Sequence, residues 1–212
     1  MVKILIADDH PLFREALSGA LEPFFEGAEV IESDNLESTL SMLEMHSDIN
    51  LVLLDLNMPG CENYYGLIRV TEDFPEVPVV VISASDSAHT ISQTIGLGAK
   101  AFISKASVVA TISDAIQTVL DGGTWVPLDL KDKIDSISQE QRDSANKVAL
   151  LTPKQFQVLK FLQAGQLNKQ IAYELGVTEA TIKAHISAIF KKLEVNTRTQ
   201  AVLLVEKLQH QM

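Results

Sequence analysis

Four short apolar runs in the first half of the chain each end in a side chain suited to phosphoryl or metal chemistry. These side chains are the pair Asp8 and Asp9, then Asp55, Ser83 and Lys105. Short runs that are apolar on both faces are typical of buried strands in a parallel sheet. The carboxyl ends of parallel strands open on one edge of the sheet, and ligands bind in the crevice outside them. We therefore expect the acids, the hydroxyl and the amine to form one site.

This set of groups is suited to Mg²⁺ and phosphate. Mg²⁺ favours a few carboxylate or carbonyl oxygens together with water and phosphate oxygens, and Asp9, Asp55 and the main-chain carbonyl of Asn57 can supply them. A carboxylate can also attack a phosphoryl group to give an acyl phosphate, whose three oxygens then need positive charge or hydrogen bonds. Lys105 and Ser83 are suited to that task. A single acid at a strand end is usually just solvated, so the prediction depends on the whole set.

Apolar periodicity predicts the elements that position these groups. Strand-length runs span residues 3–7, 28–32, 50–55, 78–83 and 100–104. Helical stripes separate them, most clearly over residues 12–21 and 108–120. Strict alternation of strand and helix implies right-handed crossovers and helices on both faces of the sheet. The expected fold of residues 1–121 is α/β, a doubly wound parallel sheet of five strands.

Polar sequence follows this segment before helical signals resume. We interpret residues 122–147 as a linker, with room for a short helix around 129–137. The sequence Thr152-Pro153-Lys154-Gln155 places a capping hydroxyl before a proline and an amide three residues after the cap, which predicts a helix start. Further helices are expected over 168–175, over about 179–192 and from 198 onward. Residues 148–212 are thus predicted to form an all-α domain of four helices.

Charge is divided unevenly along the chain. Residues 1–122 hold 5 Lys and Arg against 19 Asp and Glu, a net charge of −14, whereas residues 123–212 hold 12 against 9, a net charge of +3. Such asymmetry suggests two domains with different partners, although two differently solvated surfaces would give the same tally.

The apolar runs also bear on location. The longest are strand-sized, far below the roughly 18 residues that span a bilayer, and residues 4–7 are too few for a signal-peptide core. Cys61 is the single cysteine, which fits a reducing compartment, and we interpret it as structurally incidental. We expect a cytoplasmic protein with no membrane partner.

One face of the helix predicted after Thr178 could read DNA. Its apolar stripe comprises Ile182, Ile186, Ile189, Phe190 and Leu193, which would face a core. The opposite face carries Lys183, Ala184, Ser187 and Lys191. A helix anchored on one side and bearing lysines and small residues on the other suits the major groove. A solvated lysine face would have the same composition.

The acidic motifs resemble those of a response-regulator receiver domain, over residues 1–121. The matching motifs are Asp8-Asp9, Asp55 with Leu56-Asn57-Met58-Pro59-Gly60, Ser83-Ala84 and Lys105. The resemblance implies that Asp55 accepts phosphate from a histidine kinase, that Asp8, Asp9 and Asp55 with the Asn57 carbonyl assemble Mg²⁺, and that Lys105 contacts the phosphate. It also implies a switch pair, Ser83 and Phe102, in which the hydroxyl moves toward the phosphate and the ring follows. Many receivers have proline after the lysine, where this chain has Ala106.

Residues 150–205 resemble a LuxR-type helix-turn-helix domain. The matching residues include Leu151-Thr152-Pro153, Gly165, Asn168-Lys169-Gln170-Ile171-Ala172, Thr181-Ile182-Lys183-Ala184-His185, Lys192-Leu193 and Arg198. The family usually has an Arg-Glu pair where this chain has Lys154-Gln155. The resemblance implies that Lys183, Ala184 and Ser187 approach base edges and that Thr181, Lys191 and Lys192 contact phosphates.

Together the two segments resemble a NarL-type response regulator, which is not an enzyme beyond its own phosphorylation and dephosphorylation. The expected partners are a sensor histidine kinase, double-stranded DNA, RNA polymerase and a second copy of the chain once Asp55 is phosphorylated; phosphorylation is expected to release the helix that reads DNA. Two alternatives stay open. One is a Mg²⁺-dependent phosphatase of the haloacid dehalogenase type, although its Asp-x-Asp motif belongs on an early strand and Asp55-Leu56-Asn57 is on the third. The other is a receiver-like regulator that works without phosphorylation.

Overall fold

The computed structural model describes residues 2–127 and 139–206. The chain forms two compact units that divide between residues 137 and 138. Each unit has its own buried core, and each is described by itself below. Within the described residues, the helices are too short or too polar to cross a bilayer.

The first unit is built on a parallel sheet of five strands in the order β2-β1-β3-β4-β5. The strands are β1 Lys3–Ala7, β2 Glu29–Ser33, β3 Leu51–Asp55, β4 Val79–Ser83 and β5 Ala101–Ser104. The predicted doubly wound sheet is confirmed, and four predicted strands begin within one residue of the observed ones while the first coincides. β3 and β4 are buried at every position because helices cover both faces of the sheet.

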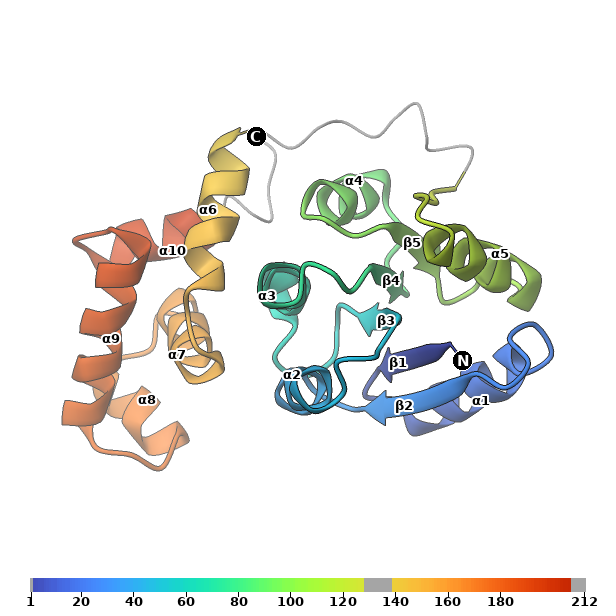
Figure 1. The fold of residues 1–212 in the computed structure, drawn as a ribbon. Helices are drawn as coiled ribbons and strands as arrows, with labels where there is room; N and C mark the ends of the chain where they lie inside the picture. The colour runs from blue at the N-terminus through green and yellow to red at the C-terminus, as the bar shows by residue number, and fades with distance from the viewer. Residues whose placement is uncertain (1, 128–138, 207–212) are drawn as a thin grey trace. The chain divides into compact units, whose positions relative to one another are not determined.

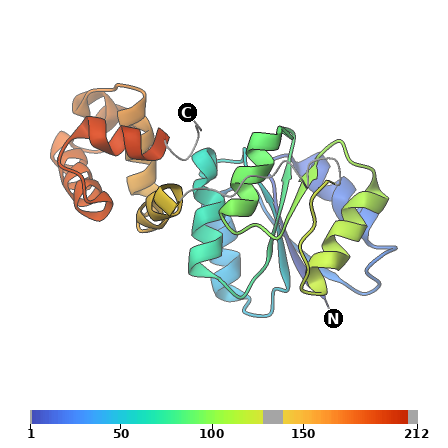
Figure 2. The same cartoon turned by 90° about the horizontal axis from the view of Figure 1, so that it is seen from above.

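Helices lie on both faces of this sheet, as Figures 1 and 2 show. Helices α1 (Pro11–Leu21) and α5 (Val109–Leu120) contact each other on one face. The other face is covered by α2 (Leu36–Met45), α3 (Tyr65–Asp73) and α4 (Ala88–Gly96). The core beneath α1 and α5 is made by alternate strand residues such as Ile4, Ile6, Leu51 and Leu53. The period of two along each strand therefore divides its side chains between two helical layers.

Local sequence explains where several of these helices begin. Pro11 occupies the first turn of α1, where its missing N–H leaves no hydrogen bond unmade. Asn35 and Ser38 form a capping box at the start of α2. A 3₁₀ turn, η1 (Glu62–Tyr64), precedes α3 and holds Asn63 and Tyr64 at positive φ. The predicted stripes are exposed at their beginnings, at Leu12, Val108 and Val109.

The second unit is all-α. It comprises α6 (Gln139–Ala149), α7 (Pro153–Gln163), α8 (Asn168–Glu174), α9 (Glu179–Leu193) and α10 (Arg198–Glu206). The last four are the helices that the sequence predicts. Thr152 and Gln155 form the expected capping box on α7, and Thr178 caps α9. Gly176, at φ +62°, makes the turn between α8 and α9 in a conformation that disfavours a side chain.

The predicted linker over 122–147 needs correction at its end. Residues 139–147 belong to α6, which packs against α9 and α10 of the second unit. The sequence does not predict this helix because few of its residues are apolar. Among its described side chains, the buried apolar ones are Ala145 and Val148. The short helix considered around 129–137 lies outside the described residues.

Candidate functional site

The acidic site lies at the carboxyl edge of the sheet, between the neighbouring strands β1 and β3. The Lys105 ammonium is 2.6 Å from Asp8 Oδ2 and 2.8 Å from Asp55 Oδ2. Ala7 pairs with Leu54 in the sheet, so the residue after each of them, Asp8 and Asp55, emerges at the same level. Both aspartates are fully buried, whereas Asp9 is exposed. The topology thus brings together Asp8, Asp55 and Lys105, three predicted site residues that lie far apart in the sequence.

Burial and charge act in opposite directions on Lys105. Burial disfavours its ammonium form, but the hydrogen bonds to Asp55 and Asp8 outweigh that effect, and the pKa of Lys105 lies above its ordinary value of 10.5. Its ammonium also lies 4.8 Å from the centre of the Phe13 ring, a favourable cation–π separation. The amine is therefore charged over the physiological pH range and held in the site.

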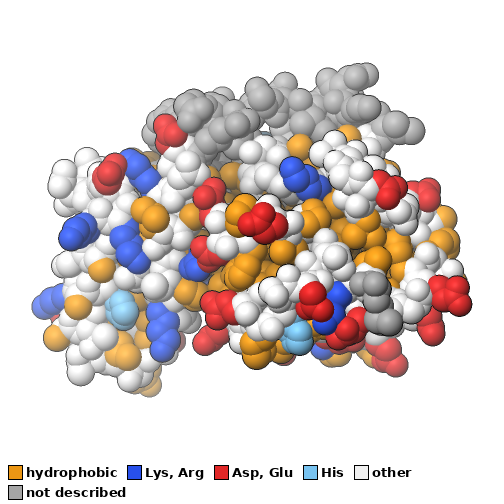
Figure 3. Space-filling view, viewed as in Figure 1, with side chains coloured by type: hydrophobic (Ala, Val, Ile, Leu, Met, Phe, Trp, Pro, Cys, Tyr) orange, Lys and Arg blue, Asp and Glu red, His pale blue; other side chains and the backbone are white. Residues whose placement is uncertain are grey.

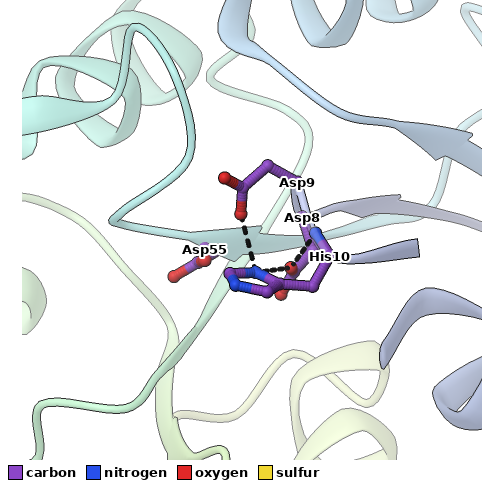
Figure 4. Close-up of side chains that lie close together, drawn as sticks. All are labelled: Asp8, Asp9, His10 and Asp55. Carbon is purple, nitrogen blue, oxygen red and sulfur yellow. Dashed lines mark hydrogen bonds and ion pairs between the residues drawn. The ribbon is translucent and has the colours of Figure 1, made fainter. Parts of the chain in front are cut away.

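His10 completes a cluster that sequence reasoning missed. Its Nδ1 lies 2.7 Å from Asp9 Oδ1 and 3.1 Å from Asp8 Oδ1, and Figure 4 marks both contacts with dashed lines. One ligand atom each from Asp8, Asp9, His10 and Asp55 lies within 4.8 Å of the others. The signal was present in the sequence, because His10 directly follows the two acids and precedes the proline that begins α1.

Arg14 is a second missed residue. It donates one hydrogen bond to the main-chain oxygen of Asp8 at 2.6 Å and another to Glu32 at 2.7 Å. These bonds tie α1 to the ends of β1 and β2 and hold the backbone from which Asp8 and Asp9 project. An arginine on a helix gives no sign in the sequence that it reaches a strand end.

The loops after β3 and β5 supply the remaining groups. The Asn57 N–H donates to Asp55 Oδ1 at 3.1 Å, which holds the start of this loop against the carboxylate. After β5, the Ser104 hydroxyl accepts a hydrogen bond from the Ala106 N–H at 3.3 Å. Lys105 reaches both carboxylates with alanine in the position that is often proline, so the departure from the family pattern leaves its ammonium in place.

The two predicted switch residues are buried. Ser83 follows Ile82, the residue that pairs with Asp55 in the sheet, and its hydroxyl accepts a hydrogen bond from the Ser85 N–H at 3.2 Å. Its main-chain oxygen accepts from the Lys105 N–H at 2.8 Å, which places the ends of β4 and β5 together. The Phe102 ring is completely buried within the sheet's helical cover. Ser83 is thus beside the acidic site, and Phe102 is in the core behind it.

A second candidate site is the exposed face of α9. Ile182, Ile189 and Leu193 are buried, while Ile186 and Phe190 of the predicted stripe are only partly buried. On the opposite face, Lys183, Ala184, Ser187 and Lys191 are all exposed. The helical period puts these four side chains on one surface of the helix.

The predicted DNA contacts differ in whether their side chains are exposed or bonded within the domain. Lys183 is exposed and pairs with Glu179 at 3.0 Å, one turn earlier. The Thr181 hydroxyl lies 2.9 Å from that of Thr178, at the start of the helix. Lys192 differs, because its ammonium donates to the Leu150 carbonyl at 2.8 Å and to Gln155 Oε1 at 2.7 Å. This arrangement gives Lys192 a role within the domain and does not support the expected phosphate contact.

Arg198 also stabilises the domain. Its guanidinium donates to the main-chain oxygens of Leu162 and Gln166 at 3.0 and 2.7 Å. These two bonds join the end of α7 and the loop after it to the start of α10. On the face seen in Figure 3, basic side chains are spread over the second unit, whereas acidic ones prevail on the first.

Two family models match the chain. The response regulator receiver domain matches residues 4–117, and the LuxR family of bacterial regulatory proteins matches residues 149–205. The two models together describe a response regulator whose receiver domain is followed by a LuxR-type regulatory domain. The alternative of a Mg²⁺-dependent phosphatase, whose site also combines aspartates, a hydroxyl and a lysine, is therefore wrong.

Similar proteins support the same assignment over nearly the whole chain. The glycerol metabolism activator of Pseudomonas putida is 43% identical over 96% of this chain and 94% of its own length. The transcriptional regulatory protein LnrK of Bacillus subtilis is 32% identical over 96% of each chain. The fold is similar to RcsB from Salmonella enterica serovar Typhimurium, solved on promoter DNA with the phosphomimetic BeF₃⁻, at a TM-score of 0.58, 21% identity and 98% of each chain. The chain belongs to the NarL/LuxR family of response regulators, in which a receiver domain is followed by a LuxR-type DNA-binding domain.

Proposed function

We propose that Asp55 receives a phosphoryl group from a sensor histidine kinase and that this controls DNA binding by α9. The observation that carries the proposal is the Lys105 ammonium held between Asp8 and Asp55. In the transfer, an oxygen of Asp55 forms a bond to phosphorus while the bond from phosphorus to the kinase imidazole nitrogen breaks, and its electron pair returns to that nitrogen. Lys105 then stabilises charge on the phosphoryl oxygens.

The donor set of the acidic site fits Mg²⁺. Asp8, Asp9 and Asp55 carry three negative charges against the single charge of Lys105, and their carboxylate oxygens lie within 4.8 Å of one another. A dication balances that excess, and hard oxygen ligands are the kind that Mg²⁺ prefers. These three carboxylates with the Asn57 carbonyl would hold the ion. When bound, it supplies positive charge to the phosphoryl oxygens.

The switch would begin at Ser83. A phosphoryl group on Asp55 adds roughly −1.5 to −2 charges and three acceptor oxygens beside this hydroxyl. Ser83 would turn from the Ser85 N–H, 3.2 Å away, toward the new acceptor. Because the ends of β4 and β5 are joined through the Ser83 carbonyl and the Lys105 N–H, the change would reach the strand that carries Phe102.

The proposed output surface is the exposed face of α9. Lys183, Ala184 and Ser187 would meet base edges, while Thr181 and Lys191 would meet phosphates. RcsB, whose fold is similar, was solved bound to promoter DNA. We propose that phosphorylation releases α9 for DNA and promotes a homodimer, because helix-turn-helix modules commonly read paired half-sites.

Further partners follow from this role. A regulator bound at a promoter acts on transcription through RNA polymerase, which we include as a proposed partner, and the proposed site of action is the cytoplasm.

We propose residues 1–121 as the receiver domain. The DNA-binding domain of this proposal extends to α6 as well as the four helices after it, since α6 packs within the same unit.

The test of the phosphoacceptor uses the full chain, Mg²⁺ and a small acyl phosphate. Wild-type protein is expected to gain one acid-labile phosphoryl group by intact-protein mass spectrometry, and Asp55→Ala is expected to gain none. Asp114→Ala, which changes an exposed aspartate on α5, is the matched control and should react like wild type. Uptake by Asp55→Ala at the wild-type rate would remove Asp55 from the role, and no uptake by wild type would favour the phosphorylation-independent alternative.

The test of the output selects DNA fragments from a random pool with and without phosphorylation. Phosphorylated protein is expected to enrich one sequence, with paired half-sites, more strongly than unphosphorylated protein. Identical enrichment by both forms, with phosphorylation verified by mass, would contradict the proposed coupling.

A further inference from the structure

We propose that His10 is a nitrogen ligand of the metal site and makes it bind first-row transition ions more tightly, relative to Mg²⁺, than carboxylates alone would. The inference rests on the acidic site proposed above, though not on its phosphorylation. His10 would then determine which ion the site selects, a property that the aspartates and Lys105 leave open.

The separations around His10 match those of ligands on one ion. Its Nδ1 lies 2.7 Å from Asp9 Oδ1 and 3.1 Å from Asp8 Oδ1. Neighbouring ligands of an octahedral ion with bonds of about 2.1 Å lie about 3.0 Å apart. The ring nitrogen is therefore spaced from each carboxylate oxygen about as one ligand is from its neighbour, and Figure 4 draws its dashed lines to both carboxylates.

The backbone that carries this ring is held in place, while the His10 side chain itself is 66% exposed. The His10 N–H donates to Asp8 Oδ1 at 2.9 Å, and the His10 carbonyl accepts hydrogen bonds from Phe13 and Arg14 at the start of α1. Pro11 restricts the backbone on the other side. An ordinary surface histidine would pair with a mobile carboxylate, whereas here one of the two partners, Asp8, is fully buried.

The second oxygens of the buried acids are already engaged elsewhere. Lys105 contacts Oδ2 of Asp8 and Oδ2 of Asp55, and Asp55 Oδ1 accepts the Asn57 N–H. Lys105 and His10 therefore contact different oxygens of Asp8. The amine and the imidazole can act on the same acid without competing for one oxygen.

Ligand chemistry gives the consequence for ion selection. Mg²⁺ prefers oxygen ligands, whereas imidazole suits ions such as Ni²⁺ and Zn²⁺. Carboxylates also bind Ni²⁺ more tightly than Mg²⁺, so the diagnostic quantity is the change in the ratio of the two affinities when the ring nitrogen is removed.

The experiment measures Mg²⁺ and Ni²⁺ dissociation constants by calorimetry on tag-free full chain without any phosphodonor. His10→Phe keeps a ring but has no donor nitrogen. It is expected to weaken Ni²⁺ binding by about tenfold or more, the scale seen when groups around a metal are lost, and to change Mg²⁺ binding by less than about twofold. His46→Phe is the matched control, because His46 follows α2 and precedes the amino end of β3, away from the site. Both affinities of the control should equal those of wild type.

A second measurement reports coordination directly. Pulsed electron paramagnetic resonance of the Mn²⁺-loaded wild type should detect ¹⁴N coupling from a bound imidazole, and the signal should be absent from His10→Phe. His10→Gln, which supplies an oxygen in place of the nitrogen, should also lack it while retaining bound Mn²⁺. Circular dichroism verifies that each variant is folded.

Three results would overturn the inference. They are equal losses of Ni²⁺ and Mg²⁺ affinity in His10→Phe, unchanged Ni²⁺ affinity in that variant, and absence of ¹⁴N coupling in loaded wild type. Because no phosphodonor is present, failure here leaves the phosphoacceptor proposal standing, and failure of phosphate uptake by Asp55 leaves this one standing.

Discussion

The ammonium of Lys105 lies 2.8 Å from Asp55, so the cation expected to stabilise a phosphoryl group already neutralises the carboxylate that would accept it. The same nitrogen is 2.6 Å from Asp8, the buried acid on the adjacent strand. Bringing two buried carboxylates together is unfavourable unless a positive charge lies between them. Lys105 therefore stabilises the fold of the receiver as well as serving its proposed chemistry.

Removal of Lys105 should destabilise the receiver in a way that a metal ion repairs. Lys105→Ala leaves Asp8 and Asp55 buried without their cation, and we expect the free energy of unfolding to fall by about 3 kcal/mol without Mg²⁺. Millimolar Mg²⁺ should restore more stability to the variant than it adds to wild type. Urea unfolding followed by fluorescence of Trp125, the single tryptophan, measures both effects. Lys100→Ala, at an exposed position, should behave as wild type; equal effects of Mg²⁺ on all three proteins would contradict the prediction.

Lys183 is predicted to contact a base. Lys183→Ala should weaken binding to a selected operator by about 1 to 3 kcal/mol and relax the preference at one base position. Binding curves at several salt concentrations measure the change on operator and on random DNA. Uniform weakening on both, with a salt slope reduced by about 1, would make Lys183 a phosphate contact instead.

Substitution of the adjacent lysines Lys191 and Lys192 should have different effects, one on DNA binding and the other on domain stability. Lys192→Ala leaves the Leu150 carbonyl and Gln155 without their donor, and it should lower the stability of the DNA-binding domain by about 1 kcal/mol. Lys191→Ala, at an exposed position, should leave stability unchanged and weaken DNA binding while reducing its salt dependence. Calorimetric unfolding of the full chain and anisotropy titration of labelled DNA give the two readouts. The prediction is wrong if the two variants exchange these effects.

Cys61 should be unreactive in the native protein. Burial, with the nearby charges of Glu62 and Asp55, raises the pKa of this thiol well above its ordinary value of 9.0. A raised pKa means less thiolate at any given pH, about tenfold less for each unit, so alkylation at pH 8 should be at least about tenfold slower than in urea. Because the folded thiol keeps its proton to a higher pH than the unfolded one, ionisation of the unfolded thiol near pH 9.0 favours unfolding. The native protein should therefore lose stability as the pH rises above 9.0. Rapid native labelling, measured by mass, would contradict the prediction.

Close packing explains why this thiol is out of reach. A Cβ added at Gly66 would lie 2.1 Å from Cys61 Sγ, so only glycine leaves room for the sulfur. The sequence interpretation of Cys61 as incidental to chemistry fits its burial, while its role in packing against α3 could not be predicted.

The strands and most helices could be predicted because their signals are local. Apolar runs such as Leu51 to Leu54 mark a strand buried on both faces, and caps such as Thr152 and Thr178 mark where helices begin. α6 could not be predicted in the same way, since its sequence is polar and its burial depends on α9 and α10. A helix stabilised mainly by its neighbours leaves little periodicity in its own residues.

The sequence by itself determined the five strands and most helices along the chain, the presence of two domains and the residues that end each strand, because hydrophobic spacing and capping act over a few neighbouring positions. Only the tertiary structure decided that Lys105 lies between Asp8 and Asp55, that His10 faces Asp8 and Asp9, and that Lys192 bonds to Leu150 rather than facing outward with Lys191. Those relationships join residues through strand pairing and side-chain direction. Charge, burial and hydrogen bonding decide which of these side chains contact one another only once the chain has folded.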